Sequence, residues 1–275
     1  MKINKYFTFL ESVGEIRIKD IGSYIDGMKL SYMDKLFFLN KIDADIIIDF
    51  GCADGFILSK IRERRPDIFL VGYDLSPEMV EICKKRFNND KNVLITDKWN
   101  DVVKICKKYK SPALVLSSVI HEVYSYSNSS DIRDFWYEKV FGGIFKWICI
   151  RDMIPSTNMN NKEKENFKME VEMVKSKVDP YYLNSFEKRW GSIDGHYRKF
   201  IHFLLKYKYI DNWEREVNEN YLPISLETLL DKRPLSYKVN YLEAFTLHTL
   251  SEEVKRDFGF EIDHTTHAKI IFKKS

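Results

Sequence analysis

The sequence predicts an α/β fold: a doubly wound, mostly parallel seven-stranded sheet with N-terminal helices and a helical insertion before the last two strands. Two observations carry this prediction. Short runs of β-branched and aromatic residues alternate with helical patterns across residues 44–153, which is typical of βαβ units in a parallel sheet. The alternation stops in residues 156–235, which are charged and mostly helical in pattern, and strand-like runs then return.

The first strand is expected at Ile46-Ile47-Ile48, because a β-branched run bounded by charge and glycine suits a strand buried on both faces. One helix is expected at 56–65, before Pro66, and another after Ser76, which can cap a helix that has Pro77 at its first position. Two further helices are expected at 101–109 and 132–140. The remaining strands are expected at 69–73, 92–96, 113–117, 145–150, 237–245 and 268–273.

The chain is expected to divide into three parts. Residues 1–43 carry helical patterning, strongest in 32–41, and are expected to form an N-terminal helical cap. Residues 44–155 and 236–275 together form the sheet domain, and residues 156–235 form the helical insertion. The insertion has an apolar helix face that consists of Phe167, Val171, Val174 and Val178.

Composition and charge narrow the classes of function. A chain of 275 residues with 44% apolar residues can bury a large core, which excludes a disordered chain. Its 44 basic and 41 acidic residues nearly balance, whereas dedicated nucleic-acid binders usually show a stronger basic bias. The four cysteines are too widely spaced for a zinc site and predict reduced thiols. With no signal peptide and no apolar run near the ~18 residues of a membrane helix, we expect a soluble cytoplasmic protein that does not contact a membrane.

A glycine loop follows the first expected strand. Gly51, Ala53 and Gly55 allow a sharp turn and a close approach of the backbone to a ligand. Asp49 precedes the loop and can attract an ammonium group, while Asp74, at the end of the second strand, can hold both hydroxyls of a ribose. A glycine loop alone also fits nicotinamide or flavin cofactors. This loop departs from the Gly-x-Gly-x-x-Gly dinucleotide pattern, however, and a second acid beside it, Asp54, would repel phosphate, so Asp49 and Asp54 together favour a cationic ligand.

These motifs resemble a known family. The segment Ile46 to Gly55 resembles the first motif of class I S-adenosylmethionine-dependent methyltransferases, and Val71 to Met79 resembles their second strand and the turn after it. The resemblance spans residues 44–153 and departs from the family at Ala53, where a central glycine is usual. It implies S-adenosylmethionine as cofactor and S-adenosylhomocysteine as product. The residues that it implies for cofactor binding are Asp49, Gly51, Cys52, Ala53 and Gly55 for the methionine part, Asp74 and Leu75 at the ribose, Met79, Asp97 and Lys98 at the adenine, and Ser117 through its backbone.

Candidates for catalysis follow the fourth expected strand, where small-molecule methyltransferases of this class often carry histidines. His121 can act as a general base toward a hydroxyl or an amine, because its ordinary pKa of about 6.5 suits that task. Glu122 can orient His121 or bind a cationic substrate. The structural alternative is that His121 caps the next helix and Glu122 faces solvent.

Three further groups have two interpretations each. Arg151 and Asp152 follow the fifth strand and either bind substrate or pair with each other. The charged segment Trp213 to Tyr221 can close over a substrate, although a solvated helix is the favoured interpretation. His264 and His267 lack a third ligand at useful spacing, so a turn before the last strand is favoured and no metal is expected.

The preferred hypothesis is a methyltransferase that acts on an oxygen or nitrogen atom of a small molecule, with the insertion 156–235 covering the acceptor site. One alternative is an RNA methyltransferase of the ribose or cap type, and another is a non-catalytic protein that binds the cofactor and a partner. An oxidoreductase with a nucleotide cofactor is disfavoured. Methylation of adenine and of cytosine C5 is also disfavoured, because neither an Asn/Asp-Pro-Pro-aromatic motif nor a Pro-Cys pair occurs.

Overall fold

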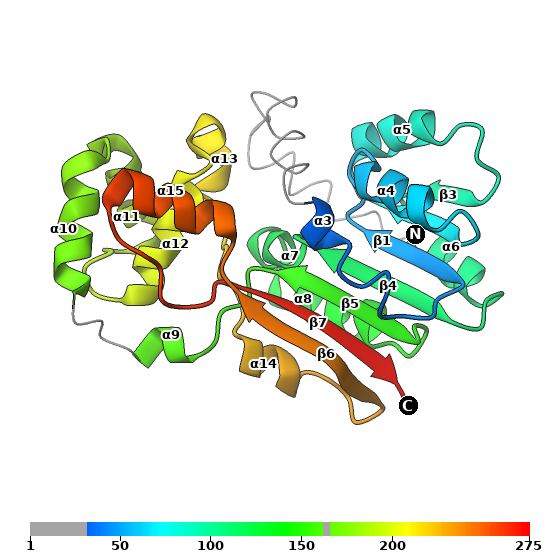
Figure 1. The fold of residues 1–275 in the computed structure, drawn as a ribbon. Helices are drawn as coiled ribbons and strands as arrows, with labels where there is room; N and C mark the ends of the chain where they lie inside the picture. Colours follow the sequence, from blue (N-terminus) through cyan, green and yellow to red (C-terminus); the bar gives the residue numbers. More distant parts are fainter. Residues whose placement is uncertain (1–31, 162–165) are drawn as a thin grey trace.

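The computed structural model describes residues 32–161 and 166–275, so the helices expected before Tyr32 lie outside the described residues. A seven-stranded sheet has the order β3-β2-β1-β4-β5-β7-β6 (Figure 1). β7 is antiparallel to both of its neighbours, β5 and β6, and the other four strand pairs are parallel. The predicted fold class is therefore confirmed. The strands are β1 (Ile46–Phe50), β2 (Phe69–Tyr73), β3 (Val93–Thr96), β4 (Pro112–Ser117), β5 (Trp147–Asp152), β6 (Tyr237–Phe245) and β7 (His267–Lys274).

Alternating strand residues build two cores, one on each face of the sheet. In β1, Ile46 and Ile48 belong to one core and Ile47 to the other, and all three side chains are fully buried. A strand with both faces buried needs an uninterrupted apolar run, which explains the triple isoleucine. One face is covered by α3 (Tyr32–Lys35), α4 (Phe56–Arg64) and α5 (Pro77–Arg86). The other face is covered by α6 (Trp99–Cys106), η1 (Phe135–Val140) and α14 (Leu226–Asp231).

A helical lobe stands beside the sheet and has a core of its own (Figure 1). Most of its helices come from the expected insertion. A further helix, α15, lies between β6 and β7, where no helix is predicted, and it packs Leu250, Val254 and Phe258 into the lobe core. These apolar residues recur every four positions, which is the signal that the sequence carries for α15. The insertion helices are α9 (Asn158–Asn161), α10 (Phe167–Lys177), α11 (Pro180–Trp190), α12 (Tyr197–Tyr207), η2 (Ile210–Asn212) and α13 (Trp213–Glu216), while α15 spans His248–Phe258.

Two short helices differ from the expected pattern around 113–140. The helix α7 (Ile120–Tyr126) begins just after β4, and α8 (Ser129–Asp134) continues into η1, a π-helix. Asn128 caps α8 by accepting hydrogen bonds from the amides of Ser130 and Asp131. Because it follows β4 directly, helix α7 begins at the carboxyl edge of the sheet, where ligands bind in folds of this type.

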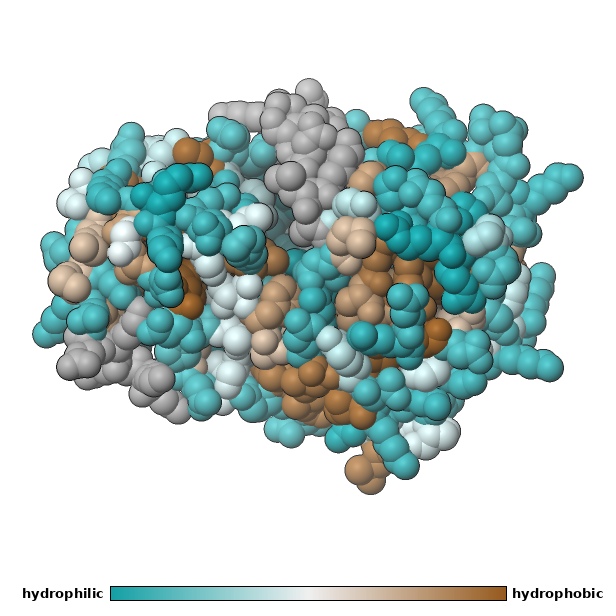
Figure 2. Space-filling view, viewed as in Figure 1, coloured by the Kyte–Doolittle hydropathy of each residue, from teal (hydrophilic) through white to brown (hydrophobic). Residues whose placement is uncertain are grey.

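The surface is mostly hydrophilic on the face that Figure 2 shows, with hydrophobic patches over the sheet. Leu235, Val239 and Leu242, on and next to the edge strand β6, are among the large apolar side chains that remain exposed. None of the helices in the described ranges is both long and apolar enough to span a membrane.

Candidate active site

The glycine loop turns sharply between β1 and α4. Gly51 and Gly55 both have φ near +77°, and Ala53 also has a positive φ of 46°. A Cβ at Gly51 would lie 2.8 Å from Val119 Cγ2, and one at Gly55 would lie 2.5 Å from Cys83 Sγ. Both positions therefore require glycine for two reasons, the left-handed backbone and the close neighbour. The side chain of Cys52 is buried in the core, so Cys52 can contact a ligand only through its backbone.

Asp74, at the end of β2, is held against this loop. Its Oδ2 accepts a hydrogen bond from the Ala53 amide at 2.8 Å, and its Oδ1 accepts one from the Ser76 amide at 2.9 Å. Burial raises the pKa of Asp74, and the two amides oppose that shift. The carboxylate thus has a fixed orientation between the loop and α5. Leu75 and Met79 lie beside it and are half-buried.

The two other acids of the loop region differ in their partners. Asp49 is 4% exposed, and burial raises its pKa to about 7, although the nearby Lys35 ammonium opposes this shift. Asp54 is paired with Arg86, whose Nη2 lies 2.5 Å from Asp54 Oδ2, and Asp54 Oδ1 accepts the Phe56 amide. The carboxylate of Asp54 therefore has partners within the protein, and Asp49 is the acid better suited to a cationic ligand.

The remaining cofactor candidates lie along the same edge of the sheet. Asp97 and Lys98 follow β3 and are exposed, and the Lys98 amide donates to Thr96 Oγ1 at 3.0 Å. Ser117 ends β4, and its Oγ is buried without a hydrogen-bond partner among the described residues. All expected cofactor residues thus gather at the carboxyl ends of β1 to β4 or in the turns and helix starts after them.

Asp152 organises the start of α7. Its Oδ2 accepts hydrogen bonds from the amides of Val119 and Ile120, at 2.9 and 2.7 Å. Its Oδ1 lies 2.8 Å from the Met153 amide and 2.8 Å from His121 Nδ1. Asp152 therefore fixes both the helix start and the orientation of the imidazole.

Arg151 and Asp152 do not pair with each other. The Nε of Arg151 donates to Asp34 Oδ2 at 2.9 Å, and its Nη1 donates to Ser118 Oγ at 3.0 Å. Ser118 has a positive φ of 56°, a conformation that is uncommon for a residue with a Cβ. The side chains of Arg151 and Asp152, which are adjacent in β5, thus lie on opposite faces of the sheet.

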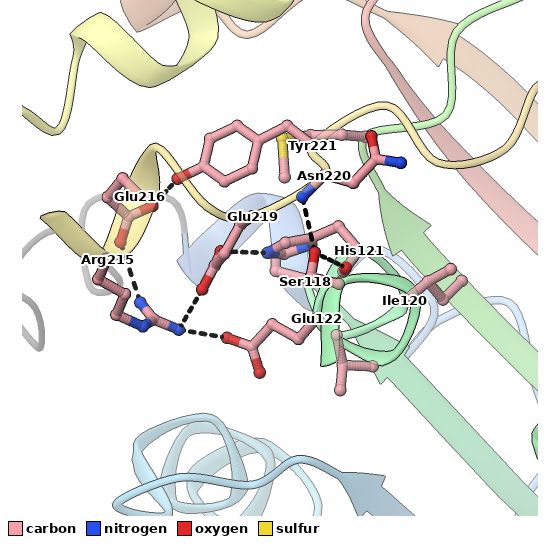
Figure 3. Close-up of polar contacts among 12 residues, drawn as sticks. Ser118, Ile120, His121, Glu122, Arg215, Glu216, Glu219, Asn220 and Tyr221 are labelled. Atoms are coloured by element: carbon pink, nitrogen blue, oxygen red, sulfur yellow. Dashed lines mark hydrogen bonds and ion pairs between the residues drawn. The ribbon is translucent and has the colours of Figure 1, made fainter. Parts of the chain in front are cut away.

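The helical lobe contributes charged residues to the site, as Figure 3 shows. Arg215, in α13, lies 2.8 Å from Glu122 and 2.8 Å from Glu219. Glu219 also lies 3.6 Å from His121 Nε2 and accepts a hydrogen bond from Tyr126 Oη at 2.9 Å. His121 therefore stands between two buried carboxylates, one from the sheet and one from the lobe.

The prediction that the segment Trp213 to Tyr221 is a solvated helix is wrong. Trp213 and Tyr221 are 4% exposed and Glu219 is 1% exposed. Lys206, which is fully buried in α12, donates hydrogen bonds to the backbone carbonyls of Glu216 and Glu219. The lobe core and this buried lysine hold the segment against α7.

The pKa of His121 follows from these contacts. Burial alone would lower it, but the carboxylates of Asp152, Glu219 and Glu122 raise the pKa to about 9. In return, the pKa of Asp152 is lowered to about 2 despite its burial. At neutral pH His121 is therefore an imidazolium ion, whose Nδ1 donates to Asp152 and whose Nε2 faces Glu219 at 3.6 Å.

His121, Glu122 and Glu219 each offer one metal-ligand atom, and these atoms lie within 4.8 Å of one another. The guanidinium of Arg215 already contacts both carboxylates and supplies the positive charge that a metal would bring. His267 is buried at the start of β7, where its Nδ1 lies 2.8 Å from Thr266 Oγ1. It belongs to no potential metal cluster within the described part of the chain.

Sequence reasoning did not single out the residues that complete this site. Arg215 and Glu219 lie more than 90 residues from their partners in α7, so no local pattern links them. The cluster of charge in 213–221 was the available signal. Asp34 and Lys35 gave no signal, because their contacts depend on how α3 packs on the sheet.

Comparison with known proteins identifies the fold and the domain. Residues 47–131 match a family model described as a methyltransferase domain, and no curated protein sequence matches the chain significantly. A solved structure of the pyocyanin biosynthetic protein PhzM is similar over 98% of this chain and 62% of its own, with 11% identity and a TM-score of 0.50. An O-methyltransferase family protein from Burkholderia thailandensis matches over 92% of this chain and 58% of its own, with 13% identity and a TM-score of 0.47. The methyltransferase domain of bacterial CtHen1-C matches over 89% and 96%, with 12% identity and a TM-score of 0.46.

Proposed function

We propose that this chain, a class I methyltransferase by its domain at residues 47–131, transfers a methyl group from S-adenosylmethionine to an oxygen or nitrogen atom of a small molecule. The observation that carries the proposal is the hydrogen-bonded pairing of Asp74 with the glycine loop at Ala53. This pairing sets an oriented carboxylate beside a tight turn with glycine at 51 and 55, at the switch point of the sheet, where an adenosine cofactor binds in folds of this type.

The residues at these strand ends fit the donor. Asp74 keeps lone pairs for two ribose hydroxyls, because each of its oxygens accepts only one backbone amide. Asp49 offers a buried carboxyl group toward an ammonium, and the loop from Gly51 to Gly55 offers backbone atoms. The sulfonium donor brings its own electrophilic methyl group, so the protein has to align the acceptor and take up its proton.

His121 and Glu122 are the groups that we assign to the acceptor. His121 carries its proton at neutral pH, since its pKa is raised to about 9. Asp152 holds Nδ1, so we assign to Nε2, which lies 3.6 Å from Glu219, a hydrogen bond that orients the acceptor atom. Glu122 is the better proton acceptor, and its pKa is raised by burial, which brings a carboxylate closer to the basicity that proton transfer needs. The charge of Glu122 also raises the pKa of Asp74, which supports its position near the donor.

Two features support a small acceptor rather than RNA. The buried segment from Trp213 to Tyr221 covers the end of α7, in line with the insertion acting as a cover for the acceptor site. The carboxylates of Glu122, Glu216 and Glu219 all contact Arg215, so protein carboxylates hold this guanidinium in place of the phosphates of a polynucleotide. Arg151 remains a candidate ligand-binding residue, whereas the oxygens of Asp152 already accept hydrogen bonds from the protein.

The proposal is tested by titration calorimetry with S-adenosylhomocysteine on the wild type and on Asp74→Asn. Loss of a charged hydrogen-bond acceptor is expected to weaken binding by about 10- to 100-fold. Asp67→Asn is the matched control, because Asp67 is exposed on the turn before β2. Equal affinity of Asp74→Asn and wild type would overturn the assignment of the donor site.

The acceptor is tested with methyl-labelled S-adenosylmethionine and a cell extract separated into RNA and a low-molecular-mass fraction. We expect label in the low-molecular-mass fraction. Transfer to RNA would contradict the small-molecule acceptor, and tight donor binding without transfer to either fraction would favour the non-catalytic alternative.

A further inference from the structure

A row of polar side chains lies on the α3 side of the sheet. Ser117, Arg151 and Lys269 are register neighbours on β4, β5 and β7, so their side chains project from the same face. Val115 and Cys149, two residues earlier on β4 and β5, belong to the core that also contains Leu36 and Leu39, next to α3. The row therefore faces the region beneath α3.

Arg151 and Lys269 are tied to α3 through Asp34. Asp34 Oδ2 accepts from Arg151 Nε at 2.9 Å, and Asp34 Oδ1 lies 2.5 Å from Lys269 Nζ. Lys269 also lies 3.4 Å from Glu243. Arg151 is 4% exposed, yet its Nη2 is buried without a partner among the described residues. Nε and Nη1 of Arg151 thus each have a partner, whereas the hydrogens of Nη2 meet no acceptor among the described residues.

The residue after Asp34 brings a second unused donor. Lys35 is 6% exposed, and its ammonium makes no hydrogen bond or ion pair within the ranges that the structure describes. Burial, followed by the charge of Arg151, lowers the pKa of Lys35 to about 8, while Asp49, Asp152 and Asp34 oppose this shift. Lys35 therefore lies within electrostatic range of Arg151 and of the acid at the end of β1.

Buried donors without acceptors are costly, so their accumulation in one place calls for an explanation. Within residues 32–161 and 166–275, the buried donors without an acceptor here are the Lys35 ammonium, Arg151 Nη2 and the hydroxyl of Ser117. Two of them are cations whose like charges repel each other. A carboxylate has two oxygens with about four acceptor sites and one negative charge, which matches this set of donors.

We infer that Lys35, Arg151 and Ser117 bind a carboxylate of a ligand beneath α3. The inference rests on the proposed function, since the ligand is the methyl donor or the acceptor of that site. The adjacent Asp49 and glycine loop favour the methionine carboxylate of the donor, because an ammonium at Asp49 and a carboxylate at Lys35 would then belong to one amino-acid group. An acceptor that carries a carboxylate is the other source.

The first arm of the test compares the affinities of S-adenosylmethionine and decarboxylated S-adenosylmethionine by calorimetry. The wild type is expected to prefer the carboxylated ligand by about tenfold or more, and Lys35→Met to lose that preference. Lys35→Arg should keep most of this preference, because it retains the positive charge. A loss in Lys35→Met alone therefore reports the missing charge and not a disturbed fold. Lys84→Met, on the exposed surface of α5, controls for the loss of one lysine.

The second arm measures the rise in melting temperature that acetate produces, with acetamide as the uncharged control, both in free protein and in the S-adenosylhomocysteine complex. A preference for the carboxylated donor that Lys35→Met abolishes identifies the donor as the source. A Lys35-dependent effect of acetate on the S-adenosylhomocysteine complex, without such a preference, identifies the acceptor. Absence of both effects overturns the carboxylate site, even where the donor itself binds. Failure of the wild type to bind either form of the methyl donor would instead contradict the proposed function. In that case the rise in melting temperature that acetate produces in the free protein would still test the carboxylate site.

Discussion

His121 contacts a different carboxylate through each ring nitrogen. Asp152 holds Nδ1 from the end of β5, and Glu219 approaches Nε2 from the helical lobe. Neither acid is more than 1% exposed at its side chain, so solvent screens these interactions weakly. The charge state of one imidazole therefore influences both the start of α7 and the contact between sheet and lobe.

This arrangement predicts a pH dependence of stability. The pKa of His121 is raised to about 9 in the folded protein, above its ordinary value of about 6.5. Its stabilising contribution is therefore complete below pH ~6.5 and is lost as the pH rises through ~9. We compare the free energy of unfolding of the wild type with that of His121→Gln. The amount by which the wild type is more stable should be about 3 kcal/mol larger at pH 6 than at pH 10.

Denaturant unfolding at a series of pH values measures this difference. His248→Gln is the matched control, since the His248 side chain is 87% exposed and 4.0 Å from a single glutamate. Comparison with the wild type at each pH removes the contributions of Asp49, Lys35 and Lys206, whose pKa values are also shifted. A difference between His121→Gln and wild type that stays constant with pH would contradict the ion-pair assignment.

At the scale of elements, the loop between β1 and α4 packs closely against the start of α7. Gly51 combines a φ of +77° with the contact that a Cβ would make at 2.8 Å from Val119. Val119 lies at the start of α7, so the glycine loop and α7 approach each other at this point. A substitution at Gly51 therefore disturbs both elements.

Gly51→Ala is expected to lower the free energy of unfolding by about 1–3 kcal/mol and to weaken binding of S-adenosylhomocysteine. Gly259→Ala is the matched control, because Gly259 has a similar φ of +85° and no atom within 4 Å of its ideal Cβ. Gly259→Ala therefore reports the backbone cost alone. If Gly51→Ala lowers the free energy of unfolding no more than Gly259→Ala does, the structure accommodates the close contact with Val119 and the prediction is wrong.

Most elements could be predicted because their residues carry a local pattern. The strand at Phe69–Tyr73 and the helix that begins at Pro77 after Ser76 have the predicted bounds or start. Helix α7 was not predicted as an element because it has only seven residues and begins where Asp152, from another strand, satisfies its first amides. A local sequence pattern cannot report a helix start that depends on a distant side chain.

At the scale of the whole molecule, Arg215 joins the helical lobe to the sheet. The lobe and the sheet have separate apolar cores, so the polar contacts between α13 and α7 are a distinct link between them. Arg215 bridges Glu122 on the sheet side and Glu219 on the lobe side, with its own side chain 14% exposed. Removal of the guanidinium leaves the carboxylates of Glu122, Glu216 and Glu219 close together without their shared cation.

Arg215→Met is expected to destabilise the protein by about 3 kcal/mol, since breaking a buried ion pair leaves uncompensated charge behind. Arg215→Lys should recover only part of this loss, because an ammonium cannot reproduce the paired geometry of a guanidinium. Arg133→Met, whose side chain is 66% exposed, is the control. Unfolding by denaturant gives the comparison, and a loss at Arg215 that matches the loss at Arg133 would contradict a structural role of the bridge.

The sequence by itself determined the fold class, the glycine loop and the acid at the end of β2. These features are legible because each depends on residues close in the chain: apolar runs for buried strands, glycines for a left-handed turn, and Asp74 at a fixed distance after Gly51. The resemblance to methyltransferases followed from the same local order of motifs, and residues 47–131 match a methyltransferase domain.

Only the tertiary structure decided which charges meet. It placed Glu219 and Arg215 beside His121, turned Asp152 into the anchor of α7, and paired Asp54 with Arg86. The physical reason is that electrostatic pairs depend on distances of a few ångströms between side chains that are far apart in sequence. Local patterns of hydrophobicity and turn residues carry no record of those distances, so the contacts of His121 and the burial of Lys35 became visible only once the sheet and the lobe were in place.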